Sequence, residues 1–556
     1  MNKKISKALK KPATFAIVAL IAISSLLTTA FVNKNFEIAR NLDIFNTLFR
    51  ELVINYVDEV NAAELIKTGI DEMLASLDPY TNFIPESDIE DFRFMTTGQY
   101  GGIGALIMRR GEYIFISETY EGFPADKGGL LPGDKILEIN DQSAYNRTQE
   151  EISTLLKGQP GTEVVIVIER GGHDQPLTKT LIREVVKIDN IPYYGLLDEN
   201  TGYIKLNSFT QNAGREVREA FIELREEHNI KNIILDLRGN GGGLLHEAVN
   251  IANIFVDKGQ LIVQTKGKIK ERNMTNRTLN NPVDTEIPLV VLVDRASASA
   301  SEIVAGAIQD LDRGVVIGQR TFGKGLVQNI VPLSYNTQLK VTVAKYYIPS
   351  GRCIQAIDYA QRDDNGSVAS IPDSLKVPFK TQGGRVVYDG AGVEPDIFVE
   401  PFTLSNISIA LLTRFHIFEF ANQFYQTHDE IPPADQFEIT DEIFQDFLSF
   451  IEGKDYSYTT DTEMLITMLE ETARDEKYFE ALTDEISSIR ASIAKTKKDD
   501  LITFGDEIRM LLKDEIAGRY YKQRGRIVAS LNDDADIREA LSLFRDREKY
   551  SSILVP

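Results

Sequence analysis

Three serines alternate with alanines in DRASASASEIVAGAIQDL, and a lysine framed by glycines follows in TFGKGLVQ. The middle serine, Ser299, precedes Lys324 by 25 residues. A serine hydroxyl becomes a nucleophile when a base removes its proton, and a lysine serves as that base only when uncharged. The pKa of Lys324 would have to fall by about 3 from its ordinary value near 10.4, which is worth about 4 kcal/mol. The apolar neighbours Phe322, Leu326 and Val327 could supply this shift by desolvation.

The elements around the serines predict where they lie. PLVVLVDR reads as a buried strand and SEIVAGAIQDL as a helix, so the serines form a strand-to-helix connection. Ser299 is expected at or beside a helix N-terminus, where free N–H groups and the helix dipole stabilise a developing oxyanion. The alternative is that the serines only cap the helix. For Lys324 the alternative is a surface residue in a glycine turn.

Two further features could complete a catalytic site. Gln328 lies four residues after Lys324, on the same side of a helix or a strand, and its amide oxygen could hold the lysine toward the serine. Glycines in DLRGNGGGLL follow a buried strand, so backbone N–H groups can approach a ligand. Gly243 could share an oxyanion hole with the N–H of Ala300. Neither a G-x-G-x-x-G nor a P-loop lysine motif supports nucleotide binding.

A histidine-based site is the competing chemistry. His246 follows the glycine loop and could serve Ser299 in a Ser-His-Asp arrangement, but its Leu244-Leu245 context favours a packing role. The chain has 5 histidines and a single cysteine, Cys353, so neither a metal cluster nor an internal disulfide is expected. We expect no cofactor.

Length and charge set the broad class of the protein. At 556 residues the chain should hold three or four domains. Its 61 Lys and Arg against 83 Asp and Glu give a net charge of −22, which argues against nucleic acid as a partner.

The N-terminus predicts export across a membrane. Five lysines precede an uncharged run over residues 12–33, roughly the length that spans a bilayer. Residues 1–34 are expected to be a membrane anchor, with a cleaved signal peptide as the alternative. Either one places the bulk of the chain on the periplasmic side of the cell envelope.

The pattern then changes three times along the chain. Helical periodicity predicts a helical module over 35–96, and short β runs with one helix predict a barrel-like module over 97–186. In that helix Thr148 and Glu151 have capping-box spacing. Near-continuous apolar strands alternate with helices over 187–402, an α/β core covered on both faces. Residues 403–556 are mainly helical and suggest no chemistry of their own.

Taken together, SASASEIVAGAIQD, GVVIGQRTFGKGLVQ, DLRGNGGGLL, KYYIPSGRCIQ and GVEPDI resemble the carboxyl-terminal processing peptidases, or tail-specific proteases, over roughly residues 36–400. The resemblance implies a multidomain α/β fold: a ClpP/crotonase-like protease core with an inserted PDZ domain, an N-terminal helical module and a helical C-terminal extension. It implies a Ser-Lys serine endopeptidase with Ser299 as nucleophile, Lys324 as general base and Gln328 orienting the lysine. Gly243 and Ala300 would form the oxyanion hole.

The resemblance also makes the β module a PDZ domain. Gly102, Ile103 and Gly104 would bind the carboxylate of a substrate tail, and a pocket lined by Ile152 and Leu155 would take its last apolar side chain. Partners would be proteins or peptides with apolar C-terminal tails, the membrane through the N-terminal segment, and possible adaptor proteins or further copies of the chain. The alternatives are a non-catalytic PDZ scaffold of the envelope and a β-barrel with no peptide function.

Overall fold

The computed structural model describes residues 36–362 and 368–555. It divides into two compact units, Met1–Phe83 and Ile84–Pro556. The expected anchor or signal peptide at residues 1–34 lies outside the described part of the chain. Among the described residues, no helix combines the length and the apolar character needed to cross a membrane.

The described part of the first unit is mainly helical and ends in the first residues of the strand β1 (Asn82–Ile84). Residues 36–55 form one helix, and α2 spans Ala62–Ala75. The side chain of Asn61 caps α2 by accepting from the backbone N–H groups of Ala63 and Glu64. Many apolar side chains of the 36–55 helix are exposed, among them Phe36 and Leu48.

The α/β core of the second unit is built on one mostly parallel sheet. Its strands follow the order β10-β11-β12-β15-β16-β23, and only the β10–β11 pair is antiparallel. Their bounds are β10 Tyr193–Asp198, β11 Thr201–Lys205, β12 Asn232–Asp236, β15 Leu289–Val293, β16 Val315–Gly318 and β23 Ile397–Phe398. Every residue of β12 and β15 is buried, as their continuous apolar runs predict for a sheet covered on both faces.

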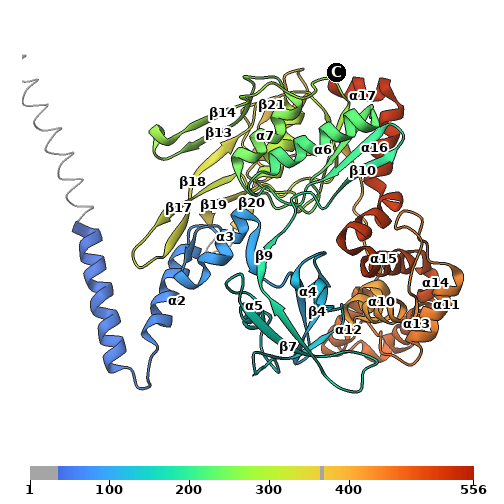
Figure 1. Ribbon diagram of the computed structural model, residues 1–556. Coiled ribbons are helices and arrows are strands. Elements are labelled where there is room, and N and C mark those ends of the chain that lie inside the picture. Colours follow the sequence, from blue (N-terminus) through green and yellow to red (C-terminus); the bar gives the residue numbers. More distant parts are fainter. Residues whose placement is uncertain (1–35, 363–367, 556) are drawn as a thin grey trace, which may run out of the picture. The chain divides into compact units, whose positions relative to one another are not determined.

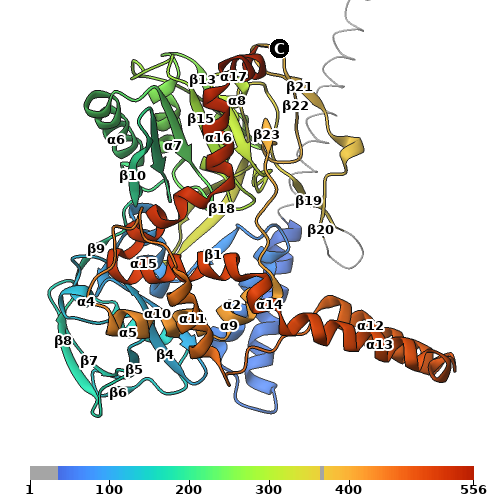
Figure 2. The ribbon, with the colours of Figure 1, turned by 90° about the vertical axis from the view of Figure 1, so that its right-hand side faces the viewer.

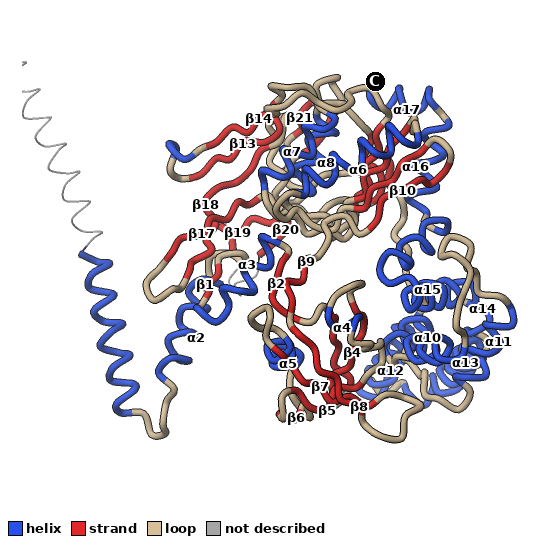
Figure 3. The backbone as a smooth tube through the Cα atoms, in the orientation of Figure 1, coloured by secondary structure: helices blue, strands red, loops and turns tan. Residues whose placement is uncertain are grey.

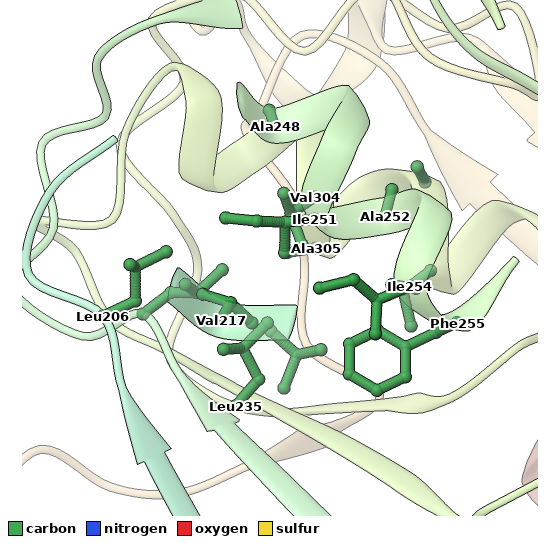
Figure 4. Packing of buried hydrophobic residues seen from close by; sticks show 14 of the residues in the cluster. Leu206, Val217, Leu235, Ala248, Ile251, Ala252, Ile254, Phe255, Val304 and Ala305 are labelled. Carbon is green, nitrogen blue, oxygen red and sulfur yellow. The ribbon is translucent and has the colours of Figure 1, made fainter. Parts of the chain in front are cut away.

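Helices from distant parts of the sequence cover the two faces of this sheet. One face packs against α6 (Ala213–His228), α7 (Leu245–Phe255) and α8 (Ala300–Asp310). Figure 4 shows Ile251, Phe255 and Val304 from two of these helices meeting in that core. The other face packs against α16 (Ala535–Arg545) and α17 (Arg547–Leu554), from the end of the chain (Figure 2). The last helices of the tail therefore form a layer of the α/β core.

A second group of strands extends from the core and carries the segment after Lys324. β18 pairs with β17 on one side and with β13 on the other, and β13 pairs with β14. The bounds are β13 Leu261–Gly267, β14 Met274–Arg277, β17 Leu326–Pro332 and β18 Gln338–Tyr347. Two small hairpins follow, β19 Ile357–Arg362 with β20 Val368–Ser370 and β21 Pro378–Lys380 with β22 Val386–Tyr388.

The β module has the strands and the single long helix that the sequence predicts (Figure 1). It begins after α3 (Ile89–Thr97), and the pair β2–β9 joins it to the core. Its elements are β2 Gln99–Gly102, β3 Ala105–Arg110, β4 Tyr113–Thr119, α4 Pro124–Lys127, β5 Lys135–Ile139, β6 Gln142–Ser143, α5 Gln149–Leu156, β7 Glu163–Glu169, β8 Leu177–Ile182 and β9 Glu184–Lys187. The capping box predicted for α5 is confirmed, with Thr148 and Glu151 each bonding the other's backbone N–H.

Residues after 405 form the helical region seen in Figure 3. Its helices are α9 Asn406–Thr413, α10 His416–Thr427, α11 Asp441–Ile451, α12 Asp461–Asp475, α13 Phe479–Lys498, α14 Asp500–Thr503 and α15 Gly505–Ser530. Aromatic and aliphatic side chains of α9, α10, α11 and α15 share one core. The helices α12 and α13 pair as a hairpin (Figure 2).

Candidate active site

The three serines of the opening motif have different surroundings. Ser297 is buried and donates from its hydroxyl to the carbonyl of Leu237 at 2.9 Å. Ser301 is buried and donates to the carbonyl of Asn240 at 2.8 Å. The outer serines thus fasten the connection to the end of β12 and to the glycine loop. Ser299, between them, is partly exposed.

Ser299 lies where the sequence predicts, immediately before α8. Its backbone has φ 57° and ψ −111°, a conformation that costs a residue with a side chain of the order of 1–3 kcal/mol. Such strain persists where the surrounding structure enforces it, and it gathers at active sites. This backbone distinguishes Ser299 from an ordinary helix cap, whose backbone is extended.

The glycine loop approaches this serine closely. A Cβ atom on Gly242 would lie 2.7 Å from Ser299 Cβ and 2.9 Å from the backbone nitrogen of Ala300, so only glycine fits. Gly243 follows with φ +146°, and its backbone forms a bridge with Phe209. The structure therefore brings together the serine, the N-terminus of α8 and the loop that contains Gly243.

A buried glutamate, Glu302, joins the serine turn to the lysine loop. Its Oε2 accepts from the backbone N–H of Ser299 at 2.8 Å and from that of Lys324 at 3.0 Å. Its Oε1 accepts from the Thr321 hydroxyl and the Gly323 N–H, both at 2.6 Å. Because one oxygen contacts both nitrogens, Ser299 N and Lys324 N are no farther apart than the sum of 2.8 Å and 3.0 Å.

Opposing effects act on the ionisation of Glu302. Burial raises its pKa, because the interior disfavours a bare carboxylate. The hydrogen bonds from Thr321, Lys324, Ser299 and Gly323 favour the charged form and oppose that rise. The hydrogen bonds from the two loops thus offset the cost of burying the carboxylate, and the carboxylate in turn holds the two loops together.

Lys324 lies in the loop before β17 and is half-buried. Gly323 and Gly325 on either side have φ +81° and +56°, left-handed conformations that explain why glycines frame the lysine. The strand begins only at Leu326, and its register shifts between Val327 and Gln328. Regular periodicity therefore does not relate Gln328 to Lys324, contrary to the reasoning from spacing.

The side-chain amide of Gln328 has a partner on the next strand. Its Nε2 donates to the hydroxyl of Thr342 on β18 at 3.2 Å. This bond fixes the amide nitrogen and leaves the amide oxygen as the acceptor that an orienting role would need. The role expected for Gln328 remains a prediction.

The far end of α8 is anchored by a buried ion pair. Asp310, the last residue of α8, pairs with Arg352 at 2.9 Å, and the two side chains are 0% and 1% exposed. Arg352 also donates to Gln309 at 2.7 Å, and the Ser350 N–H donates to Asp310 at 2.9 Å. Both ends of α8 are therefore fixed by carboxylates.

The glycine loop is anchored from behind by the tail of the chain. Arg238, directly before the glycines, pairs with Asp236 at the end of β12. It also pairs with Asp534 and Asp536 at the start of α16, each at 2.7 Å. Although Asp236 is buried, the charges of Arg238 and Lys205 lower its pKa. The tail thus contributes polar contacts to the residue that precedes the glycine loop, which the tail's sequence did not indicate.

His246 is not in the packed position that its sequence context favours. Its side chain is 64% exposed at the start of α7, where Nε2 lies 3.4 Å from Glu247. Within the described residues, no group of three or more His, Cys, Asp and Glu side chains is arranged to hold a metal ion.

A groove of the β module lies between β3 and α5. A cavity of about 200 Å³ is lined there by Phe94, Tyr100, Ile103, Ala105, Leu106, Ile107, Tyr120, Gln149, Ser153, Leu156 and Lys157. Because β3 is the edge strand of its sheet, a peptide can add beside it. The cavity is below the 300–1,000 Å³ typical of ligand pockets, so it suits a single side chain.

Two residues expected in this pocket lie elsewhere. Ile152 is 0% exposed in the core of the module, and Leu155 packs against that core. The turn of α5 presents Gln149, Ser153 and Leu156 to the cavity instead. The expected pocket residues Ile152 and Leu155 face the core of the module rather than the groove. Gly102, Ile103 and Gly104, at the end of β2 and in the turn into β3, are buried.

Glu302 is the main residue that the sequence reasoning missed. Its signal was available, since serine followed three residues later by glutamate is the capping-box pattern. The first half of that pattern, the glutamate bonding the Ser299 N–H, is present. Nothing in the pattern indicates that the same carboxylate also binds the lysine loop.

Comparison with known proteins agrees with this architecture. A family model described as Peptidase family S41 matches residues 200–361, one described as PDZ domain matches 115–170, and one described as Probable PDZ-protease, C-terminal helical domain, matches 407–544. The Carboxy-terminal-processing protease of Bartonella bacilliformis is 34% identical over 346 residues, 62% of this chain and 78% of the relative. A Probable CtpA-like serine protease of Staphylococcus epidermidis is 32% identical over 346 residues, 61% and 69% of the two chains.

Among solved structures, a photosystem II D1 C-terminal processing protease is 29% identical, covers 65% of this chain and 88% of its own, and has a TM-score of 0.37. The fold and the sequence matches define a serine-type peptidase with a PDZ domain, whose substrates are proteins or peptides. The chain belongs to peptidase family S41, which includes the carboxy-terminal-processing proteases.

Proposed function

We propose that this peptidase cleaves by a Ser-Lys mechanism, with Ser299 as nucleophile and Lys324 as general base. The observation that carries the proposal is the shared carboxylate of Glu302, which holds the backbones of both residues. The strained conformation of Ser299 and the close approach of Gly242 support it. No residue of this arrangement requires a metal or an organic cofactor.

In the acylation step, the neutral amine of Lys324 takes the hydroxyl proton of Ser299. The alkoxide attacks the carbonyl carbon of the scissile peptide bond, and the N–H groups of Gly243 and Ala300 bind the resulting oxyanion. The ammonium of Lys324 then gives its proton to the leaving nitrogen as the C–N bond breaks. Gln328, through its amide oxygen, orients the Lys324 side chain. The products are an acyl-enzyme and a free amine.

Deacylation repeats these transfers with water. Lys324 removes a proton from a water molecule as the water oxygen attacks the ester carbonyl carbon, and the N–H groups of Gly243 and Ala300 again bind the oxyanion. The ester bond then breaks, and the proton on Lys324 returns to the Ser299 oxygen. The enzyme is regenerated with the amine neutral.

Selectivity comes from the tail of the substrate as well as from the cleaved bond. An apolar C-terminal segment adds beside β3, with its carboxylate at the loop of Gly102, Ile103 and Gly104. The amide of Gln149 donates to the carbonyl of Ile107 at 2.9 Å across this edge. An incoming strand needs that acceptor, so Gln149 must turn away when a tail binds. A flexible side chain does so at little cost.

The basic and apolar N-terminal sequence supports a location at the cell envelope, on the periplasmic side, with the segment 1–34 as anchor or export signal. The substrates would then be envelope proteins, delivered directly or by an adaptor. The exposed apolar side chains of the 36–55 helix support association with further copies of the chain.

The test is an assay of separate Ser299→Ala and Lys324→Ala variants on a protein substrate with an apolar C-terminal tail. Each should lose activity while keeping its fold, as measured by circular dichroism and thermal unfolding. Lys231→Ala, which removes an exposed lysine whose amine donates to Asn229, is the matched control and should remain active.

The outcome also decides between the competing functions. A wild-type chain that binds tails but never cleaves them would favour a non-catalytic scaffold. Loss of turnover on replacing His246 alone, with Lys324→Ala still active, would favour a Ser-His-Asp hydrolase. Loss with Ser299 and Lys324 but with no histidine variant supports the proposed mechanism.

A further inference from the structure

A lysine stands at the mouth of the peptide groove, beside the loop expected to bind a carboxylate. Lys157 ends α5, and its Cα lies 3.8 Å from the place a Cβ on Gly102 would take. The N–H of Gly158 donates to the carbonyl of Gly101 at 3.0 Å, which fixes the end of α5 against this loop. The Lys157 side chain lines the groove cavity.

An acidic side chain from outside the β module already pairs with this lysine. Asp91 lies on α3, the helix before the module, and its Oδ1 is 2.6 Å from Lys157 Nζ. The two side chains are 66% and 35% exposed, so water reaches the pair. Exposed ion pairs of this kind contribute little to the folding free energy, so this contact does little to stabilise α3.

Aromatic residues extend the same arrangement into the groove. Phe94 of α3 and Tyr100 both line the cavity and meet edge to face at 5.3 Å. The Tyr100 ring lies over the carboxylate loop, since its Cε2 is 2.6 Å from where a Gly102 Cβ would be. Its hydroxyl hydrogen-bonds with the backbone of Gly104, and burial raises its pKa, so the phenol stays neutral. Aromatic side chains of α3 and β2 therefore line the groove beside the loop expected to bind a tail.

We propose that Lys157 binds the terminal carboxylate of a substrate tail and that Asp91 occupies Lys157 when the groove is empty. This assignment rests on the proposed function, in which the groove recognises C-terminal tails. An aspartate side chain and a chain terminus present the same carboxylate, so one can replace the other on the ammonium. The charge-assisted bond adds to the N–H groups of the glycine loop.

The exposure of the pair sets how strongly the two carboxylates compete. A half-exposed ion pair holds Asp91 weakly, so a tail displaces it readily and its removal improves tail binding by about 2- to 5-fold. The bond from Lys157 to a tail is made in a partly enclosed groove to a charged group. Its loss should weaken binding by about 10-fold.

The experiment uses the full chain carrying Ser299→Ala, so that bound peptide is not cleaved. The probe is a fluorescein-labelled decapeptide with three apolar C-terminal residues, prepared as the free acid and as the C-terminal amide. Fluorescence anisotropy gives a dissociation constant for each form. The ratio of the two constants measures recognition of the carboxylate alone.

Four added substitutions test the assignment. Lys157→Gln should weaken the free acid about 10-fold and leave the amide unchanged. Asp91→Asn should tighten the free acid about 2- to 5-fold, and this gain should vanish when combined with Lys157→Gln. The matched controls are Lys135→Gln and Glu169→Gln, an ion pair of the same module on β5 and β7, outside the groove lining. Neither control should alter the ratio.

The two levels of the proposal fail differently. If the chain with Ser299→Ala alone binds neither form, or binds acid and amide equally, tail recognition by the groove is wrong. If it prefers the acid and Lys157→Gln keeps that preference in full, the groove function stands and the role of Lys157 is overturned. A gain from Asp91→Asn that persists without Lys157 would overturn the competition between the carboxylates.

Discussion

Replacement of Glu302 by glutamine tests the physical core of the proposed mechanism. The carboxylate accepts four short hydrogen bonds, at Oε1 from Thr321 and Gly323 and at Oε2 from Ser299 and Lys324, and a longer one at Oε2 from the Tyr346 hydroxyl at 3.5 Å. In Glu302→Gln one oxygen becomes an NH₂ group, which cannot accept. Whichever way the amide turns, at least one backbone N–H of the serine turn or the lysine loop loses its acceptor.

The geometry sets two separate magnitudes. A buried N–H left without a partner costs about 1–3 kcal/mol of folding free energy. A shift of one loop by about 1 Å relative to the other misaligns the serine and the lysine, and such misplacement lowers rates by about 100-fold. We therefore expect kcat to fall about 100-fold with KM little changed, since the groove that captures the tail is not altered.

The assay combines steady-state cleavage of an apolar-tailed substrate with urea unfolding of the same preparations. Glu247→Gln is the matched control, because Glu247 is a buried glutamate whose two oxygens accept from the backbone N–H groups of Asn212 and Gly214. Its partners lie at the start of α6. It should lose comparable stability while kcat stays within about threefold.

The result that would refute the reasoning is a Glu302→Gln enzyme with nearly normal kcat. If stability falls in both variants but activity falls in neither, the carboxylate is only a structural cap for α8. If Glu247→Gln loses as much activity as Glu302→Gln, the activity loss reports general loosening of the core rather than the register of the two loops.

Three further predictions rest on other contacts. Gly242→Ala should lower kcat/KM at least about 100-fold without unfolding the chain, because the new Cβ would lie 2.7 Å from Ser299 Cβ. Gly239→Ala is the control and should remain active, since no atom lies within 4 Å of its Cβ. An active Gly242→Ala enzyme would contradict the geometry. Arg352→Met should reduce the free energy of unfolding by about 3–5 kcal/mol, because it leaves the Asp310 carboxylate buried and unpaired. Arg215→Met is the control and should cost less than about 1 kcal/mol, since Arg215 and its partner Glu219 are both 62% exposed. Equal losses in urea titrations would contradict this reasoning. Burial raises the pKa of Asp514 to about 7, so the folded chain keeps a proton that the unfolded chain loses near pH 4. The free energy of unfolding should therefore fall by up to about 4 kcal/mol as the pH rises between these two values. Asp514→Asn should flatten this decline in unfolding curves at pH 5 and pH 8, and an unchanged slope would show that the proton is held elsewhere.

Much of the fold follows from local sequence. The central residues of β12 and all of β15 are apolar because both faces of the sheet are covered, and that pattern is visible without coordinates. The capping box at Thr148 is equally local, since both its bonds join residues three apart. Local signals of this kind predicted the elements and the position of Ser299 before α8.

What the sequence missed involves residues far apart in the chain. We expected Ile152 to line the tail pocket, but which side of α5 faces the groove depends on where β3 and the core strands lie. Likewise Asp534 and Asp536 look like a solvated acidic pair until α16 packs against the sheet and meets Arg238. Helical periodicity shows which side chains share a face of a helix, but not which other element packs against that face.

The sequence by itself determined the chemistry available to this protein: a serine before a helix, a lysine between glycines and a glycine loop after a buried strand. Only the tertiary structure decided that one carboxylate, Glu302, holds the first two together. The physical reason is range. Helical hydrogen bonds and caps join residues a few positions apart, so the sequence shows them directly. The donors to a buried carboxylate come from segments far apart in the chain, and only their packing in the folded structure brings them together.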